Sequence, residues 1–360
     1  MKKRNTFVMS LFNSLLPVLS AFIIGAIIIL LIGENPMTTY WIMLKYTLFD
    51  WGGFLKTLHY ASPLILTSLA IAITFKANIF NMGVEGQMLG GAFVSCILGF
   101  SLNGLSTPIH ILICITAGIL TGMLFAIVPA ILKAYFKVNE MVVTLMLNYA
   151  IIEILRVLAQ TIFRDPSSGY VSTPAVLPSA MFKRLGGTSL TLFTLITIIV
   201  FAVMYTVMKK SRLGYEIKAI GRNPEFAEAS GMNVRKKIIY MMLISGALSG
   251  LAGAGFMMSE KFKYTLDFSG NPGLGWDGML ISLLGSHNPI GILIAAILYS
   301  ALKTGSDSIG IFANVPKEIV FVIQGMIILF LSIKFLDERT KLFANFKTRF
   351  IPKRTPEEAD

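Results

Sequence analysis

The chain has 360 residues, of which 55% are hydrophobic and 14% are charged, and its mean hydropathy is +0.73. Soluble domains contain roughly 45–50% apolar and about 25% charged residues, so this composition excludes a water-soluble enzyme or DNA-binding domain. At about 20 residues per membrane-spanning helix, the apolar residues suffice for roughly nine or ten spans. We therefore predict an all-α, polytopic membrane protein.

The formal net charge of +12 indicates contact with membrane lipids, and no nucleic acid partner is expected. The basic residues gather in a few loops and in the C-terminal tail, where anionic headgroups and the positive-inside rule account for them. Most of the 31 Lys and Arg residues fall on the inner side when the N-terminus is placed in the cytoplasm. Both termini are therefore predicted to be cytoplasmic, which requires an even number of spans.

Apolar runs separated by turn residues predict ten spans, of which the third, eighth and ninth are short. The first follows Met1-Lys2-Lys3-Arg4 and has no small-residue cleavage site after it, so it is interpreted as an uncleaved span. In chain order the spans lie at 14–32, 57–75, 85–101, 108–132, 139–160, 190–208, 238–258, 272–285, 290–304 and 317–335. The predicted regions are a cytoplasmic N-terminus (1–13), a membrane domain (14–335) with an inner loop (209–237), and a cytoplasmic tail (336–360).

Two short sequence echoes favour an inverted-topology repeat. Gly83-Val84-Glu85-Gly86 and Gly275-Trp276-Asp277-Gly278 open the third and eighth spans, which are short and broken. Asn139-Glu140-Met141-Val142 and Lys317-Glu318-Ile319-Val320 open the fifth and tenth. The members of each pair run in opposite directions across the membrane, as such a repeat requires. Because each match is only a few residues long, chance similarity remains the alternative.

The inner loop 209–237 carries eight Lys or Arg residues and one compact helix signal. Asn223 is predicted to cap the helix, and Pro224 suits its first position because no hydrogen bond is needed there. Glu225 complements the positive end of the helix, and Gly231 can adopt the left-handed stop. The pattern predicts a two-turn helix over 224–230, interpreted as a docking element for a cytoplasmic partner or as a solvated connector.

Polar side chains within the spans are costly unless they have a role or a partner, so they are the candidates for a solute pathway. Neutral amides suit an uncharged polar solute better than an ion. Each group could equally be a local cap or a hydrogen bond between helices. Glu153 and Arg156, three residues apart on one helix, are expected to pair with each other. The candidate pathway residues are Asn81, Glu85, Gln87, Asn139, Asn148 and Asp277.

Motifs for other chemistries are missing from the sequence. No G-x-x-x-x-G-K-[ST] phosphate loop, H-E-x-x-H zinc motif or G-x-S-x-G elbow occurs. His59, His110 and His287 are isolated from one another, and Cys96 and Cys114 lie in apolar segments. We therefore expect no catalytic residue, metal site or bound cofactor in this chain.

The motifs together resemble the bacterial ABC importer permeases for nucleosides and related simple sugars. The resemblance rests on Asn78–Gln87, Gly221–Met232, Gly275–Gly278, Leu283–Pro289 and Gln324-Gly325, and covers roughly residues 57–335. The counterparts of 81–87 look different in ribose-type and branched-chain amino acid permeases, which favours the nucleoside branch.

The resemblance implies a multi-pass permease subunit of the bacterial plasma membrane, with about ten helices. It implies a second permease chain, often a paralogue, two cytoplasmic ATPase subunits that use ATP, and an extracytoplasmic substrate-binding lipoprotein. The helix at 224–230 would then be the coupling helix, with Asn223, Pro224, Glu225, Phe226, Ala229 and Gly231 as its defining residues. The outer loop 161–189 would receive the loaded binding protein.

Two alternatives remain open at the level of sequence. One is an ABC permease for a simple sugar such as a pentose, in place of a purine nucleoside such as guanosine. The other is a secondary transporter driven by H⁺ or Na⁺, which would use Glu85, Asp277 or the Glu153–Arg156 pair as its coupling site. Such a carrier has no need of a capped docking helix.

Overall fold

The computed structural model of the chain describes residues 19–269, 272–313, 315–316, 318–327 and 329. The chain divides into two compact units, one formed by 1–43 with 305–360 and the other by 44–304. All regular elements among the described residues are helical, and two isolated β-bridges accompany them. The predicted all-α class is therefore confirmed.

The larger unit contains long apolar helices joined by short helical turns. The long helices are α3 (Trp51–Phe75), α4 (Val84–Ser101), α5 (Thr107–Phe136), α6 (Glu140–Gln160), α7 (Leu192–Lys210), α10 (Val234–Phe256) and most of α13 (Pro289–Phe312). The short helices are α8 (Arg212–Arg222), α9 (Pro224–Ala229), α11 (Leu266–Ser269) and α12 (Leu274–Leu284), together with the π-helical turns η1 (Lys45–Phe49) and η2 (Met257–Lys261). Polar side chains begin several of these helices: Asp50 caps α3, and Asn233 caps α10.

The smaller unit combines the helix Leu19–Leu31 with α2 (Pro36–Leu44) and the helix Glu318–Ile327. Gly25 allows the first and last of these to pack closely, because a Cβ atom there would lie 2.7 Å from Cγ1 of Ile323. The hydroxyl of Tyr40 on α2 donates to the carbonyl of Phe22 at 2.7 Å. Segments from the two ends of the chain thus form one unit.

The ten predicted spans each coincide with an apolar helix of the described residues. Seven helices are long and apolar enough to cross a membrane, and shorter apolar helices lie at Leu19–Leu31, Leu274–Leu284 and Glu318–Ile327. The eighth span is short as predicted, whereas the ninth is longer, because α13 runs to Phe312. α2 and η1 were not predicted. The proposed cytoplasmic tails 1–13 and 336–360 lie outside the described residues.

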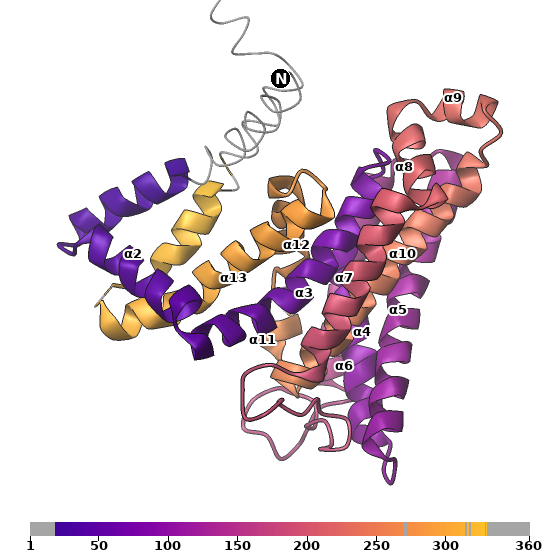
Figure 1. Ribbon diagram of the computed structural model, residues 1–360. Helices are drawn as coiled ribbons and strands as arrows, with labels where there is room; N and C mark the ends of the chain where they lie inside the picture. The colour runs from indigo at the N-terminus through magenta and orange to yellow at the C-terminus, as the bar shows by residue number, and fades with distance from the viewer. Residues whose placement is uncertain (1–18, 270–271, 314, 317, 328, 330–360) are drawn as a thin grey trace, which may run out of the picture. The chain divides into compact units, whose positions relative to one another are not determined.

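Within residues 44–304, the two largest connections lie at opposite ends of the long helices (Figure 1). α8 and α9 form one connection. The irregular segment 161–191 forms the other, where the N–H groups of Thr173 and Val176 donate to the carbonyls of Tyr264 and Phe262 at 3.0 and 2.9 Å. The loops 209–237 and 161–189 therefore face opposite sides, as their predicted inner and outer positions require.

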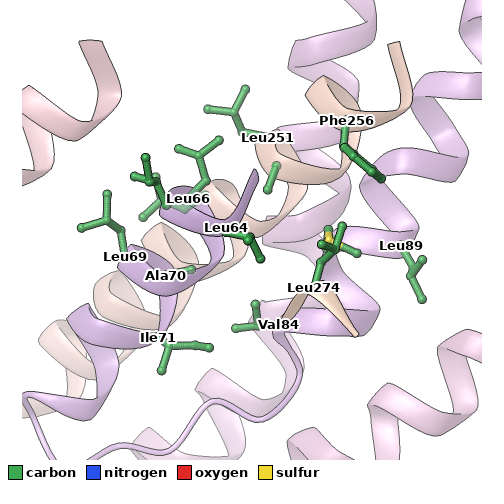
Figure 2. Packing of buried hydrophobic residues seen from close by; sticks show 14 of the residues in the cluster. Leu64, Leu66, Leu69, Ala70, Ile71, Val84, Leu89, Leu251, Phe256 and Leu274 are labelled. Carbon is green, nitrogen blue, oxygen red and sulfur yellow. The ribbon is translucent and has the colours of Figure 1, made fainter. Parts of the chain in front are cut away.

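The core of this unit lies among α3, α4, α10 and the beginning of α12. Figure 2 shows their side chains gathered around the middle of α3, with Leu64, Leu66, Leu69, Ala70 and Ile71 from α3, Val84 and Leu89 from α4, Leu251 and Phe256 from α10, and Leu274 from α12. Nearly all of the apolar stretch of α3 is accordingly buried inside the protein. The central position of α3 makes the turn that follows it a meeting point of several helices.

Small residues on α10, gathered within residues 245–253, allow two helices to approach its backbone. A Cβ atom at Gly122 of α5 would collide with the carbonyl oxygen of Gly246, and one at Gly253 would collide with that of Met88 on α4. Between helices in a membrane, such close packing replaces the hydrophobic effect as the source of stability. α10 is thus held between α4 and α5 by backbone contact.

We predict that Gly122→Leu destabilises the chain by about 1–3 kcal/mol or more, because the side chain has no space beside the α10 backbone. Denaturant titration of the purified protein in detergent measures this. Gly310→Leu is the matched control, since a Cβ atom at this helical glycine meets nothing within 4 Å. Equal stability of the two variants would contradict the close contact of α5 and α10.

Candidate functional site

The beginnings of α4 and α12 meet inside the larger unit, and the carboxylate of Glu85 joins them. The N–H of Gly273 donates to Oε1 of Glu85 at 3.0 Å, and the N–H of Gly275 donates to Oε2. Glu85 is 1% exposed. A helix that begins in a buried place leaves N–H groups that need acceptors, and a carboxylate also suits the positive helix end. Glu85 therefore caps α12 from 190 residues away in sequence.

Asp277 lies in the first turn of α12, and its partners are on α13. The hydroxyl of Tyr299 donates to Oδ1 of Asp277 at 2.5 Å, and Nζ of Lys303 lies 3.5 Å from Oδ2. The two acidic residues of the sequence echo thus both hold α12, one at its beginning and one on its side. Neither carboxylate lacks a partner inside the protein.

Asn81 and Gln87 form a buried pair of amides between the α3–α4 turn (residues 76–83) and α4. Nδ2 of Asn81 donates to Oε1 of Gln87 at 3.1 Å and to Oγ of Ser245 on α10 at 2.9 Å. The N–H of Gly83 donates to Oδ1 of Asn81 at 3.1 Å. The predicted amides are therefore brought together, and they link three elements of the bundle.

Asn148 lies fully buried on α6 and faces the beginning of α4. Its Oδ1 accepts from the N–H of Gly86, whereas its Nδ2 has no hydrogen-bond partner among the described residues. Asn148 and Gln87 line a small recess between α4, α5 and α6, together with Thr144 and the apolar Phe125. The recess has no room for a water molecule in this conformation. A buried donor without a partner is costly, so Nδ2 of Asn148 is a candidate contact for a polar group.

Asn139 has a different environment from the other predicted residues. It is exposed at the beginning of α6, where its Oδ1 accepts from the N–H groups of Met141 and Val142 at 3.0 and 3.5 Å. This is the N-cap geometry that Asn favours. Of the two interpretations of Asn139, a pathway residue or a local helix cap, its contacts are those of a local helix cap.

Two further polar residues of α6 hold the α3–α4 turn and were not among the sequence candidates. Oε1 of the buried Glu140 accepts from the N–H of Phe80 at 3.2 Å, and its Oε2 lies 2.6 Å from Nζ of Lys133. The hydroxyl of Thr144 accepts from the N–H of Met82 at 3.0 Å. The sequence signal for this contact was the position of Glu140 directly after the capping Asn139. A carboxylate at the beginning of a helix can accept from N–H groups of its own helix or of a neighbouring segment.

The predicted two-turn helix of the inner loop is α9, Pro224–Ala229, and its ends are formed as expected. Oδ1 of Asn223 accepts from the N–H of Phe226 at 3.0 Å. Gly231 has φ +81°, and the N–H of Met232 donates to the carbonyl of Ala227 at 3.1 Å, which closes the C-terminus. Glu225, Phe226 and Ala229 are exposed, and Phe226 is 70% exposed. All residues of the helix except Ala227 are exposed, so it presents an aromatic side chain among small and acidic ones.

A buried carboxylate, which sequence reasoning missed, fixes the loop that carries α9. Glu216 on α8 is 4% exposed; its Oε2 lies 2.6 Å from Nζ of Lys237 on α10, and its Oε1 3.2 Å from Nε of Arg212. At the level of sequence, the basic residues of this loop were used only to place the loop on the cytoplasmic side. Arg212 and Lys237 both pair with Glu216, and the contact with Lys237 ties α8 to the beginning of α10.

Several other ionisable groups among the described residues have partners within the protein. Glu153 and Arg156 form the predicted pair at 3.2 Å and are exposed. Each histidine contacts a neighbour: His59 lies 3.5 Å from Glu260, and His110 lies 2.9 Å from the hydroxyl of Ser179. No group of three or more His, Cys, Asp or Glu residues that could hold a metal ion occurs in this part of the chain.

His287 lies in the turn between α12 and α13, where its ring contacts Phe75 and its Nδ1 lies 2.9 Å from Oγ of Ser282. Burial, and secondarily the cation of Lys76, lowers the pKa of His287 to about 4. The ring is therefore neutral at physiological pH. It supports the turn by packing and hydrogen bonding, and adds no charge to this end of the bundle.

The fold and these buried polar groups define a multi-pass membrane protein with polar side chains between short helices, an architecture suited to a permease. Comparison with known families agrees: residues 53–332 match the family described as branched-chain amino acid transport system / permease component. The chain belongs to this family of transport permeases, and the family that its motifs resemble is confirmed.

Three relatives have similar lengths and assigned transport roles. The nucleoside ABC transporter permease protein NupB of Lactococcus lactis is 32% identical over 90% of this chain and 91% of its own. The guanosine ABC transporter permease protein NupP of Bacillus subtilis is 32% identical over 86% and 89%. The glucose ABC transporter permease protein TsgB13 of Haloferax volcanii is 29% identical over 93% and 90%. No solved structure matches the chain.

We predict that Glu85→Gln lowers the free energy of unfolding by about 1–3 kcal/mol, because the amide nitrogen of Gln faces an N–H of α12 where an acceptor is needed. Thermal or denaturant unfolding in detergent tests this. Glu153→Gln applies the same substitution to an exposed ion pair, whose loss costs about 0.2–1 kcal/mol. If Glu85→Gln were as stable as Glu153→Gln, the cap on α12 would be wrong.

Proposed function

We propose that this chain is the permease subunit of an ATP-driven importer of nucleosides, purine nucleosides such as guanosine in particular. The observation that carries this is the match to NupB and NupP at 32% identity over nearly the whole of each chain. The neutral amides of Gln87 and Asn148 support it, because they can exchange hydrogen bonds with an uncharged base or ribose.

A simple sugar is the second candidate solute. The permease TsgB13, whose name assigns it glucose, is 29% identical over 93% of this chain. Sugars and nucleosides share hydroxyl groups that amides can bind, so the polar recess suits both. The two nucleoside-assigned relatives are more similar in sequence, and we therefore place nucleosides first.

For the pathway, we propose that solute passes beside the recess of α4, α5 and α6, where Gln87 and Asn148 lie. Asn81 positions Gln87 through the amide pair. Glu85, Asp277 and Asn139 act on this pathway by holding the beginnings of α12 and α6. In this proposal the recess, which has no room for a water molecule, corresponds to the closed form of the route. Solute enters when the surrounding helices separate.

The partners that we propose are a second permease, a paralogue of this chain, two cytoplasmic ATPase subunits and an extracytoplasmic binding lipoprotein. The complex lies in the bacterial plasma membrane with both termini of this chain in the cytoplasm. α9 contacts the ATPase, and the segment 161–189 at the other end of the bundle receives the binding protein. The exposed α9, fixed on a loop by the buried Glu216, supports this assignment, because a docking element must be accessible and rigid.

In this mechanism ATP is bound and hydrolysed by the partner ATPases and not by this chain. Closure of the ATPases on ATP displaces α9, and the permease pair changes between outward and inward openings. The binding protein supplies much of the selectivity, so the permease itself can hold solute weakly. Weak holding also favours rapid release on the inner side.

The first test is purification of the tagged chain in mild detergent, followed by uptake of radiolabelled guanosine or adenosine into vesicles with and without ATP. We expect the ATPase to co-purify and uptake to require hydrolysable ATP. Excess unlabelled guanosine should compete, and excess ribose or glucose should not; the reverse would establish the sugar candidate. Uptake by the chain alone that follows an ion gradient would overturn the importer.

We predict that Glu225→Arg combined with Ala229→Arg reduces recovery of the ATPase at least about tenfold, since bulky cations replace small and acidic groups at the centre of a contact. Uptake should fall with it, while the chain remains folded in the membrane. Ala175→Arg places the same side chain at an exposed position of the opposite loop and should retain the ATPase. Unchanged uptake in the double variant would refute the coupling role of α9.

A further inference from the structure

The α3–α4 turn is bonded directly to the helix that precedes α9. Nδ2 of Asn78 donates to the carbonyl of Gly221 on α8 at 2.7 Å. Gly221 lies two residues before Asn223, whose side chain caps α9. One hydrogen bond therefore connects the base of the exposed helix to a turn at the end of α3.

The contact between this turn and α8 is close as well as polar. A Cβ atom at Gly221 would collide with the carbonyl oxygen of Lys76 and lie 3.0 Å from Cα of Ala77. Asn78 has φ +56°, a left-handed conformation that Asn tolerates better than most residues. The turn and α8 thus fit against each other through backbone atoms, which leaves little freedom for one to move without the other.

The other end of the same turn reaches the buried polar groups. Asn81, three residues after Asn78, holds Gln87 and Ser245. Phe80 and Met82 are bonded to Glu140 and Thr144 on α6, as described above. Glu85 lies in the first turn of α4, four residues after Asn81, and caps α12. The turn therefore contacts α8 on one side, and α4, α6 and α10 on the other, within eight residues.

We propose that Asn78 is a positioning residue that transmits displacement of α9 to the Asn81–Gln87 pair and to the cap on α12. The inference rests on the proposed function, because it takes α9 as the ATPase contact. Coupling between distant sites requires an element that both sites bias. The α3–α4 turn meets this requirement. α8 sets the position of the turn on the cytoplasmic side, the amide of Asn81 fixes the turn to α4 and α10, and Glu85 at the beginning of α4 caps α12.

The test measures solute uptake per ATP hydrolysed by the complete complex in vesicles. Asn78→Gly retains the left-handed backbone and removes the amide donor. The ATPases should co-purify as with the wild type, and hydrolysis should continue. Uptake per ATP should fall about fivefold, the factor that corresponds to loss of one hydrogen bond of ordinary strength.

Two variants and one control identify the cause. Gly221→Ala disturbs the same contact from α8 and should lower the ratio in the same direction. Asn78→Asp also removes the donor and gives the answer if Asn78→Gly assembles poorly. Lys137→Gly is the control, because Lys137 has φ +53° at the exposed end of α5 and should keep the wild-type ratio.

An unchanged ratio in the Asn78 variants would overturn the inference. So would an equal fall of uptake and hydrolysis, which a merely structural role produces. Failure of the proposed function is a different result: the wild-type chain would then not retain an ATPase, or its uptake would not depend on ATP.

Discussion

A helix that begins inside a membrane protein leaves its first backbone N–H groups without acceptors. In this chain Glu85 accepts the hydrogen bonds of such groups at the beginning of α12, and the arrangement of the larger unit depends on that contact. No water is available at such a place, so the acceptors must come from the protein. The carboxylate of Glu85 supplies two oxygens to the N–H groups of Gly273 and Gly275. This permits α12 to be short and to begin against α4, and it joins the two halves of the chain at one point.

The same constraint applies to the polar groups around the α3–α4 turn, several of which are amides and hydroxyls. Neutral groups can satisfy one another at lower cost than charges in an apolar setting. Asn81, Gln87 and Ser245 do so around the α3–α4 turn, and the turn is thereby fixed to α4 and α10. Asn148 departs from this pattern because its Nδ2 has no partner in the described part of the chain.

The loop that carries α9 combines an exposed surface with a rigid base. α9 itself is short and presents Phe226 to the outside. Its base is held by the buried Glu216, by Lys237 and by the backbone contact of Gly221 with the α3–α4 turn. A force applied to α9 therefore acts on the buried end of the bundle and is not absorbed by a flexible loop. The proposed coupling of α9 to a partner depends on this rigid connection.

Local patterns in the sequence were sufficient to determine the spans and α9. Hydropathy follows from the local sequence, so each predicted span could be located as an apolar helix, and seven of those among the described residues are long enough to cross a membrane. The ends of α9 depend on Asn223, Pro224 and Gly231, all within one short segment. The partners of the buried groups could not be found this way. That Glu85 caps α12, that Asn81 pairs with Gln87, and that Glu140 and Glu216 fix two loops was decided by the tertiary structure alone. Most of these contacts join residues far apart in the chain, and each polar group has several acceptable partners until packing brings one within reach.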